Sequence, residues 1–225
     1  MLKRIVDIIV AGSLLVVTLP IIVISAILVK LDSKGPVFFR QSRMGREFTE
    51  FQLFKFRTMV EGSKGLPYTL GPDPRITRCG RWLRWAKFDE LPQLWNVLRG
   101  EMSLVGPRPV IPALTREFRR EYRKLLRARP GLTDPATLKY RSETDLLAMV
   151  PEPMRYFKTV VTPDKLRISL AYQKRATVWT DLGVLARTFV ALVAPLWRQA
   201  PREAVEPGMR RVSAQVLSQQ PMRGA

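Results

Sequence analysis

Residues 5–29 read IVDIIVAGSLLVVTLPIIVISAILV and carry one charged side chain, Asp7. An α-helix rises about 1.5 Å per residue, so an apolar helix of this length is long enough to cross the hydrocarbon core of a bilayer. A secretory signal peptide would have a shorter apolar core and a cleavage site after it, whereas KLDSKGPVFF follows here. The stretch therefore predicts a membrane-embedded helix within a first region, residues 1–34.

Pro20, in the middle of this helix, leaves two topologies open. A proline inside a helix removes a backbone hydrogen bond and clashes with the preceding turn, so it kinks or breaks the helix. Basic residues flank both ends, with Lys3 before the apolar stretch and Lys30 after it, whereas a simple span carries its positive charge mainly on one side. The flanks suit a helix that bends and leaves on the face where it entered, but a kinked spanning helix fits the sequence equally well.

The charge balance narrows the class of partner. The chain has 38 Lys and Arg against 19 Asp and Glu, a formal net charge of +19. Such an excess implies a polyanionic partner, which means nucleic acid, an anionic membrane surface or a phosphorylated substrate. Histidine is absent and Cys79 is the one cysteine, so imidazole bases, His-ligated zinc and an intrachain disulfide are excluded. Any catalysis must rest on carboxylates, Lys, Arg, Tyr, hydroxyl groups or a hard metal ion.

The rest of the chain predicts a mainly helical α+β fold. Aromatic and polar residues alternate over 37–59, with Gly45 at a turn, which predicts a short β-hairpin. Residues 60–74 predict a loop, and a helical pattern begins at residue 75. The composition beyond Ala200 predicts a disordered tail, residues 201–225.

Two later segments are expected to be amphipathic helices at the membrane interface. Residues 113–129, ALTREFRREYRKLLRAR, repeat apolar side chains every three or four positions among arginines. Such a helix can lie among lipid headgroups, and a solvated basic helix on a globular core is the alternative. Residues 163–197 form the second segment, whose aromatic anchors are Tyr172, Trp179, Phe189 and Trp197.

An adjacent pair of acids stands out in residues 88–110, FDELPQLWNVLRGEMSLVGPRPV. Neighbouring residues do not share a helix face, so Asp89 and Glu90 taken alone are typical of a helix start capped by Asp89. Cationic neighbours change this interpretation, because Arg84 precedes the pair and Arg108 follows it. Nearby positive charge keeps a carboxylate ionised.

The loop of residues 106–109, Gly-Pro-Arg-Pro, is called the arginine loop, and its sequence indicates a role for the positive charge. Pro107 and Pro109 restrict the backbone on both sides of Arg108, and a planar guanidinium held in this way suits phosphate recognition. An ionised carboxylate can attack phosphorus, or it can hold Mg²⁺ that bridges phosphate oxygens. In a chain without histidine, phosphoryl chemistry by carboxylates and Mg²⁺ is the natural candidate.

These motifs together resemble the bacterial sugar transferase family, the monotopic phosphoglycosyl transferases that start polysaccharide and glycoconjugate assembly. FKFRTM (54–59) and DELPQLWNVLRGEMSLVGPRPV (89–110) carry the resemblance. Further matching pieces are KRIVDI near the N-terminus, LDSKGPVFFRQSRMG (31–45), PDPRITRCGRWLR (72–84) and RPGLT (129–133). Several long motifs in the right order over about residues 2–190 are far more specific than one short pattern.

The resemblance implies transfer of a sugar-1-phosphate from a nucleotide diphosphate sugar, expected to be a UDP-sugar, to a polyprenyl phosphate, expected to be undecaprenyl phosphate. It makes Asp89 the nucleophile that forms an aspartyl phosphosugar, with Mg²⁺ bound at Asp89. Glu90 is then its partner, orienting or deprotonating the lipid phosphate. Lys55, Arg84 and Arg108 match cationic residues that gather around phosphates.

The resemblance also implies a location. Residues 1–34 become a re-entrant membrane helix and residues 35–200 a membrane-associated catalytic domain on the cytoplasmic face of a bacterial inner membrane. Expected partners are membrane lipids and downstream glycosyltransferases, and nucleic acid is not expected. A membrane-tethered basic binding protein and an inactive scaffold member of the family are the alternatives.

Two departures from the family pattern matter. The family breaks its helix at a Ser-Pro step, whereas this chain has Leu19-Pro20, with Thr18 available to cap the freed backbone. Residues 130–141 read PGLTDPATLKYR where the family usually has PGITGWAQVNGR. Donor selection is expected to differ if this stretch binds the nucleotide or the sugar.

Overall fold

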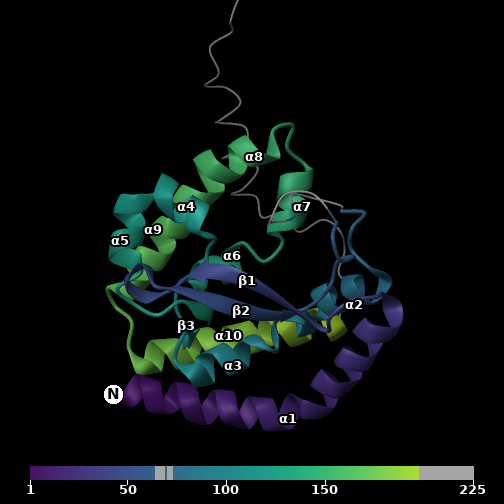
Figure 1. Ribbon diagram of the computed structural model, residues 1–225. Helices are drawn as coiled ribbons and strands as arrows, with labels where there is room; N and C mark the ends of the chain where they lie inside the picture. Colours follow the sequence, from purple (N-terminus) through teal and green to yellow (C-terminus); the bar gives the residue numbers. More distant parts are fainter. Residues whose placement is uncertain (64–68, 70–72, 198–225) are drawn as a thin grey trace, which may run out of the picture. The chain divides into compact units, whose positions relative to one another are not determined.

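The computed structural model describes residues 1–63, 69 and 73–197 (Figure 1). The chain divides into two units, Met1–Leu192 and Val193–Ala225, and every contact reported below lies in the first. The described part is mainly helical with a short antiparallel hairpin, which confirms the predicted secondary-structure class. The predicted tail, 201–225, lies outside the described residues, as does part of the predicted loop at 60–74.

Helix α1, Leu2–Asp32, runs unbroken through Pro20. Figure 1 shows it passing beneath α3, Gln93–Arg99, and then turning upward to reach α2, Arg78–Ala86. One face is buried along its length, on both sides of the proline, at Asp7, Ala11, Ser25 and Val29. The outer face exposes Ile5, Ile9, Val16, Val17, Leu19, Val23, Ile24, Ile27 and Leu31. The helix therefore bends without breaking, and Thr18 Oγ1 donates to the Leu14 carbonyl at 2.6 Å.

Both ends of α1 are attached to the same unit. At the N-terminal end, Asp7 accepts hydrogen bonds from Ser103 Oγ at 2.8 Å and from the Leu104 backbone N–H at 3.1 Å. At the C-terminal end, the Arg57 guanidinium donates to three carbonyl oxygens, those of Val29, Ser33 and Lys34. Charged and polar groups of the globular part thus hold an otherwise apolar helix at two distant points.

The predicted β-hairpin is confirmed. Strands β1, Phe38–Met44, and β2, Glu50–Phe56, pair antiparallel, with Arg43 opposite Phe51 and Phe39 opposite Lys55. Side chains alternate between the two faces of a strand, so Arg43 and Lys55 lie on the same face of the hairpin.

A short 3-10 turn, η2, Phe88–Glu90, carries the acid pair. It begins after Lys87, whose left-handed backbone (φ 59°) ends α2 and turns the chain sharply. Helix α3 follows and ends at Gly100 with φ 84°, a conformation that glycine adopts without steric cost. Strand β3, Ser103–Val105, then leads into the arginine loop.

The basic segment 113–129 differs from the sequence-based expectation. It folds as α4, Pro112–Glu117, and α5, Arg119–Leu125, separated at Phe118. Its apolar side chains are buried against Met44 of β1 and Leu166 of α9, Thr162–Gln173, and include Tyr122, Leu125 and Leu126. The interfacial prediction is wrong for this segment, because its apolar stripe completes the protein core and leaves the arginines outside.

Strand β4, Gly131–Thr133, pairs parallel with β3. The elements that follow β4 in the chain are all helical: α6 (Pro135–Lys139), α7 (Glu143–Ala148), α8 (Pro153–Tyr156), the π-helical turn η3 (Phe157–Val161), α9 and α10 (Val178–Trp197). The unusual Asp134-Pro135 step in the 130–141 stretch starts α6, where Asp134 accepts a hydrogen bond from the Thr137 backbone N–H at 2.7 Å. The departure from the family pattern thus has a local structural use, as a helix cap with proline at the first position.

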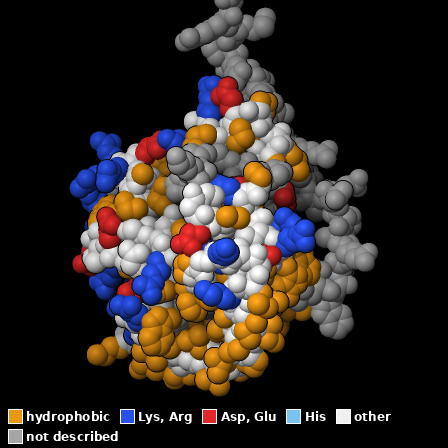
Figure 2. Space-filling view, turned by 45° about the vertical axis from the view of Figure 1, so that its right-hand side comes forward, with side chains coloured by type: hydrophobic (Ala, Val, Ile, Leu, Met, Phe, Trp, Pro, Cys, Tyr) orange, Lys and Arg blue, Asp and Glu red, His pale blue; other side chains and the backbone are white. Residues whose placement is uncertain are grey.

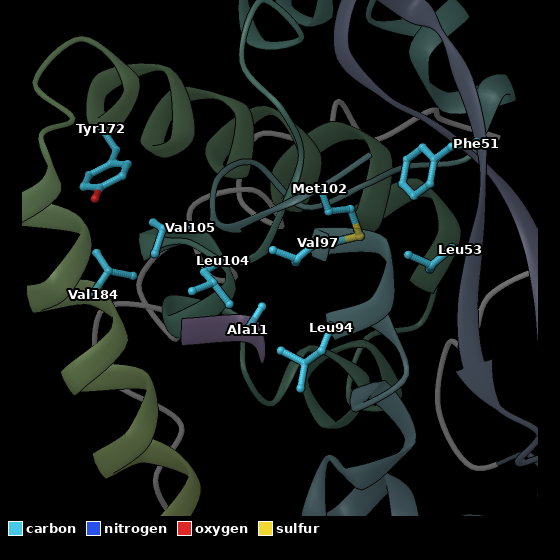
Figure 3. Close-up of a cluster of buried hydrophobic side chains, with 10 residues drawn as sticks. All are labelled: Ala11, Phe51, Leu53, Leu94, Val97, Met102, Leu104, Val105, Tyr172 and Val184. Atoms are coloured by element: carbon cyan, nitrogen blue, oxygen red, sulfur yellow. The ribbon is translucent and has the colours of Figure 1, made fainter. Parts of the chain in front are cut away.

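Figure 3 shows one core cluster, which joins α1, the hairpin, α3, β3 and the C-terminal helices; its labelled members are Ala11, Phe51, Leu53, Leu94, Val97, Met102, Leu104, Val105, Tyr172 and Val184. Tyr172 is buried here and donates to Asp181, so it is not a membrane anchor as expected. Trp179 and Phe189 on α10 are exposed, at 81% and 67%. The side chain of Trp197 lies outside the described residues.

Candidate active site

Three chain segments meet at the carboxylate of Glu90. Lys55 on β2 places Nζ 3.2 Å from Glu90 Oε1. Arg108, in the loop after β3, donates from Nη1 to Glu90 Oε2 at 3.1 Å and from Nη2 to Glu90 Oε1. The fork-like guanidinium engages both carboxylate oxygens, the geometry that makes such pairs strong and directional. Lys55, Glu90 and Arg108, which are distant in the sequence, are therefore brought together.

The two neighbouring acids lie in opposite electrostatic environments. Burial by itself raises the pKa of Glu90, but the charges of Arg108 and Lys55 outweigh burial and hold that pKa below its ordinary value. Burial and the nearby Glu90 charge raise the pKa of Asp89, which is only 7% exposed. Cationic neighbours lower the pKa of Glu90, which they contact, whereas at Asp89 burial and the Glu90 charge outweigh the effect of the nearby cations.

Asp89 also has an unpaired oxygen. Its Oδ1 atom is buried and has no hydrogen-bond partner among the residues that the structure describes. A buried carboxylate oxygen without a donor is costly and more reactive than a solvated one. Asp89 thus has the environment expected of a nucleophile, beside a carboxylate that cannot take that role while both its oxygens are bound.

Arg84 lies next to this cluster without joining it directly. Its Nε donates to Thr58 Oγ1 at 2.8 Å and its Nη1 donates to Thr69 Oγ1 at 3.0 Å. Burial lowers the pKa of Arg84, and the charge of Asp89 opposes that shift. Of the predicted cations, Arg84 therefore acts on Asp89 through its charge, whereas Lys55 and Arg108 form hydrogen bonds with Glu90.

Arg43 also lies at this site, although the sequence did not indicate it. This residue lies on β1, on the same face of the hairpin as Lys55, and its charge acts on Arg108 and Glu90. Its Nη1 donates to the Pro109 carbonyl at 3.4 Å and its Nη2 donates to Gln41 Oε1 at 2.6 Å. The alternation of β1 could have indicated its face, but only the pairing register with β2 shows that this face is the site.

The donor set fits a metal ion shared with a substrate better than a metal cage. No group of three or more Asp, Glu or Cys side chains that could hold a metal occurs among residues 1–63, 69 and 73–197. Glu90 is already bound by Arg108 and Lys55, which leaves the Asp89 carboxylate as the available ligand. Mg²⁺ commonly uses one or two carboxylates together with substrate phosphates, so this carboxylate is compatible with Mg²⁺.

Comparison with known proteins identifies the chain as an enzyme of the phosphoglycosyl transferase class. A family model described as "Bacterial sugar transferase" matches residues 1–195. The chain belongs to this family, as the motifs in its sequence indicate.

Similar proteins carry consistent names. The chain is 36% identical over 197 residues to a protein of Caulobacter vibrioides named UDP-glucose:undecaprenyl-phosphate glucose-1-phosphate transferase. The matched region covers 85% of this chain and 69% of that protein. The chain is 38% identical over 200 residues to the undecaprenyl-phosphate glucose phosphotransferase of Komagataeibacter xylinus, covering 83% and 35%. It is 35% identical over 194 residues to an Escherichia coli protein with the same name as the Caulobacter one, covering 84% and 39%. The chain thus spans little more than a third of two of these relatives.

Proposed function

We propose that this chain transfers a sugar-1-phosphate from a UDP-sugar to undecaprenyl phosphate and so begins the assembly of a polysaccharide or glycoconjugate. The observation that carries the proposal is the division of roles within the acid pair. Glu90 is bound by Arg108 and Lys55, while Asp89 is buried with an unpaired oxygen. Family membership and the names of the similar proteins supply the substrate classes.

The reaction proceeds in two displacements at the same phosphorus. In the first, an Asp89 carboxylate oxygen bonds to the β-phosphorus of the donor. The bond from that phosphorus to the bridging oxygen breaks, and UMP leaves with the electron pair. In the second, a phosphate oxygen of undecaprenyl phosphate attacks the phosphorus of the aspartyl phosphosugar, and Asp89 leaves as a carboxylate. Covalent catalysis divides one difficult transfer into two easier steps.

Glu90 positions the cations in this scheme. A carboxylate whose pKa is held below its ordinary value is a weak base, so removing a proton from the lipid phosphate is a poor assignment for it. By fixing Lys55 and Arg108 in the site, Glu90 presents positive charge where phosphate oxygens gain negative charge during transfer. Of the two roles that the sequence left open for Glu90, orientation is the one we propose.

Mg²⁺ would be held by the Asp89 carboxylate together with the donor diphosphate. When bound, the ion neutralises phosphate charge and favours departure of the nucleotide. Lys55 and Arg108 act on the same charge from the side of Glu90.

The same proposal places the chain on the cytoplasmic face of a bacterial inner membrane, with α1 re-entrant. Helix α1 is long and apolar enough to cross a membrane. Yet Asp7 near its start and Val29 near its end both contact the same unit, and a straight crossing would separate these contacts by the bilayer. Figure 2 shows hydrophobic side chains gathered along the lower margin, where α1 lies, with charged side chains above. Exposed Trp179 and Phe189 suit the same interface.

The deciding experiment is a screen of UDP-sugars with undecaprenyl phosphate and Mg²⁺, in which UMP release is measured for the purified chain. We expect release with at least one donor, dependent on the lipid phosphate, and no release by Asp89→Asn. Wild-type protein that binds membranes and remains folded but releases UMP from no donor would contradict the proposal.

A further inference from the structure

Arg43 is partly buried at the edge of the candidate site, and it forms no ion pair with an Asp or Glu among the residues that the structure describes. Its two hydrogen bonds go to neutral acceptors, the Pro109 carbonyl and the Gln41 side chain. Its Nε atom is buried and has no partner among the described residues. Even partial burial of a guanidinium is unfavourable when its acceptors are neutral and one N–H is left unpaired, which indicates a role beyond these contacts.

The charges around Arg43 make its position more unfavourable still. Burial and the positive charge of Arg108 lower the pKa of Arg43 to about 10, and the charge of Glu90 only partly compensates. Glu90 forms ion pairs with both Lys55 and Arg108. Together with Arg43, these three cations outnumber the two carboxylates of the acid pair, which leaves a local excess of positive charge. A bound anion would remove this excess.

Holding the arginine loop in place does not require Arg43. Met44, the next residue of β1, donates its backbone N–H to the Val110 carbonyl at 2.9 Å, and these two residues form an isolated β-bridge. That backbone contact joins β1 to the loop whatever side chain stands at position 43. The 3.4 Å contact from Arg43 to the Pro109 carbonyl is long for a hydrogen bond by comparison.

We infer that Arg43 is a phosphate-binding residue of this site, which acts beside Arg108 on a phosphate group of a substrate. Arginine has five N–H groups, and two of them are used in the bonds to Pro109 and Gln41. The phosphate is either that of the donor diphosphate or that of the lipid, and this identification rests on the proposed function. Binding of phosphate by Arg43 itself rests on burial, charge and position alone.

The chain contains a matched control on the same strand. Arg40 lies on the opposite face of β1, exposed, with its guanidinium 5.3 Å from the centre of the Phe54 ring. Arg43→Gln and Arg40→Gln remove the same charge from the two faces of one hairpin. Any effect of net charge on the whole protein appears in both variants, and an effect on the site appears in Arg43→Gln.

The first measurement uses inorganic pyrophosphate as the probe, with thermal melts of the full chain in detergent or nanodiscs across a titration. We expect wild type and Arg40→Gln to be stabilised with the same apparent Kd, and Arg43→Gln to show an apparent Kd at least about tenfold higher. An apparent Kd for Arg43→Gln equal to that of wild type would overturn the inference. If this variant does not fold, the same criterion applies to Arg43→Lys, which keeps the charge but loses the planar fork.

The second measurement separates the two sources of phosphate. A donor role predicts that Arg43→Gln forms the phosphosugar adduct more slowly from a UDP-sugar alone, by about tenfold or more. A lipid role predicts normal adduct formation and a raised KM for undecaprenyl phosphate. Changes below about twofold in both would count against Arg43. The pyrophosphate titration needs no donor, so it still decides the role of Arg43 if wild type turns over no UDP-sugar and the proposed function fails.

Discussion

Arg108 engages Glu90 through both terminal nitrogens, with Nη1 3.1 Å from Oε2 and Nη2 bonded to Oε1. Pro107 and Pro109 flank this arginine, and Gly131 packs so closely against Gly106 that a Cβ built there would lie 2.1 Å from the Gly106 nitrogen. The backbone of the loop is therefore confined on both sides of Arg108. The guanidinium is held in one orientation before any substrate binds, which is the preorganisation that charge stabilisation in a transition state requires.

Arg108→Lys should lower kcat/KM although the charge is kept. An ammonium group cannot engage both oxygens of Glu90 or of a phosphate as a planar fork does. Loss of a charged hydrogen bond costs about 1.5–3 kcal/mol, which corresponds to roughly a ten- to hundredfold fall in turnover. Steady-state kinetics on Arg108→Lys and Arg108→Ala, with melts to confirm folding, measure this. A near-normal kcat/KM in folded Arg108→Ala would rule out the phosphate role.

Glu90→Gln should destabilise the protein, because it leaves Lys55 and Arg108 without their shared carboxylate. Removing one partner of a buried ion pair costs about 3 kcal/mol at the low end of the usual range, and the low end applies because Arg108 is partly exposed. The folded-state pKa of Glu90 is lowered, so its contribution is present above the ordinary glutamate pKa and lost as pH falls below it.

Melting temperatures of wild type and Glu90→Gln from pH 3.5 to 8 test this sign. The gap between the two proteins should be largest near neutral pH and should narrow below about pH 4. Glu117→Gln is a suitable control, since Glu117 forms its ion pair with Lys158 far along the chain from the acid pair. A gap that is constant across the pH range would contradict the ionic role of Glu90.

Asp89→Asn should abolish the phosphosugar adduct and also stabilise the fold. The folded-state pKa of Asp89 is raised, so wild type loses stability as pH rises from the ordinary aspartate pKa through the folded-state pKa, and the neutral amide does not. We expect Asp89→Asn to be more stable than wild type at neutral pH, because the amide removes a buried negative charge.

Two measurements check this variant. Intact-protein mass spectrometry with donor alone tests for the adduct, and an adduct that persists in Asp89→Asn would exclude this residue as the nucleophile. Melts from pH 3.5 to 8 should show a stability difference that grows as pH rises above the ordinary aspartate pKa. A variant less stable than wild type across this range would show that the carboxylate has a structural role instead.

Cysteines at both ends of α1 should react from the same side of the membrane. Leu2→Cys and Lys34→Cys, each in a Cys79→Ser background, place thiols at exposed positions next to the two attachment points of the helix. Both should react with an impermeant reagent from the cytoplasmic side. Reaction of position 2 only from the periplasm would establish a spanning helix. Pro20→Ala restores a backbone bond and should shift part of the population toward that labelling pattern.

Some features could be predicted from local sequence because their causes are local. The alternation of aromatic and polar residues over 37–59 predicted the hairpin of β1 and β2, and the run of apolar residues over 5–29 predicted α1. The segment 113–129 shows the limit of the same reasoning. The sequence shows the apolar stripe but does not determine which surface packs against it. In the structure, residues of β1 and α9 pack against the stripe.

The sequence by itself determined the chemistry available to this protein. It supplied a long apolar helix, an acid pair, a proline-framed arginine and a chain without histidine, and these point to phosphoryl transfer by carboxylates at a membrane. Tertiary structure alone decided how the charges are distributed. Lys55 and Arg108 lie 35 and 18 residues from Glu90 in the sequence, and only the packing of the fold brings them into contact with it. The burial of Asp89 and the position of Arg43 beside the site likewise depend on how β1, β2 and η2 pack. Adjacent carboxylates acquire opposite pKa shifts because desolvation and charge act through space, over distances that chain separation does not define.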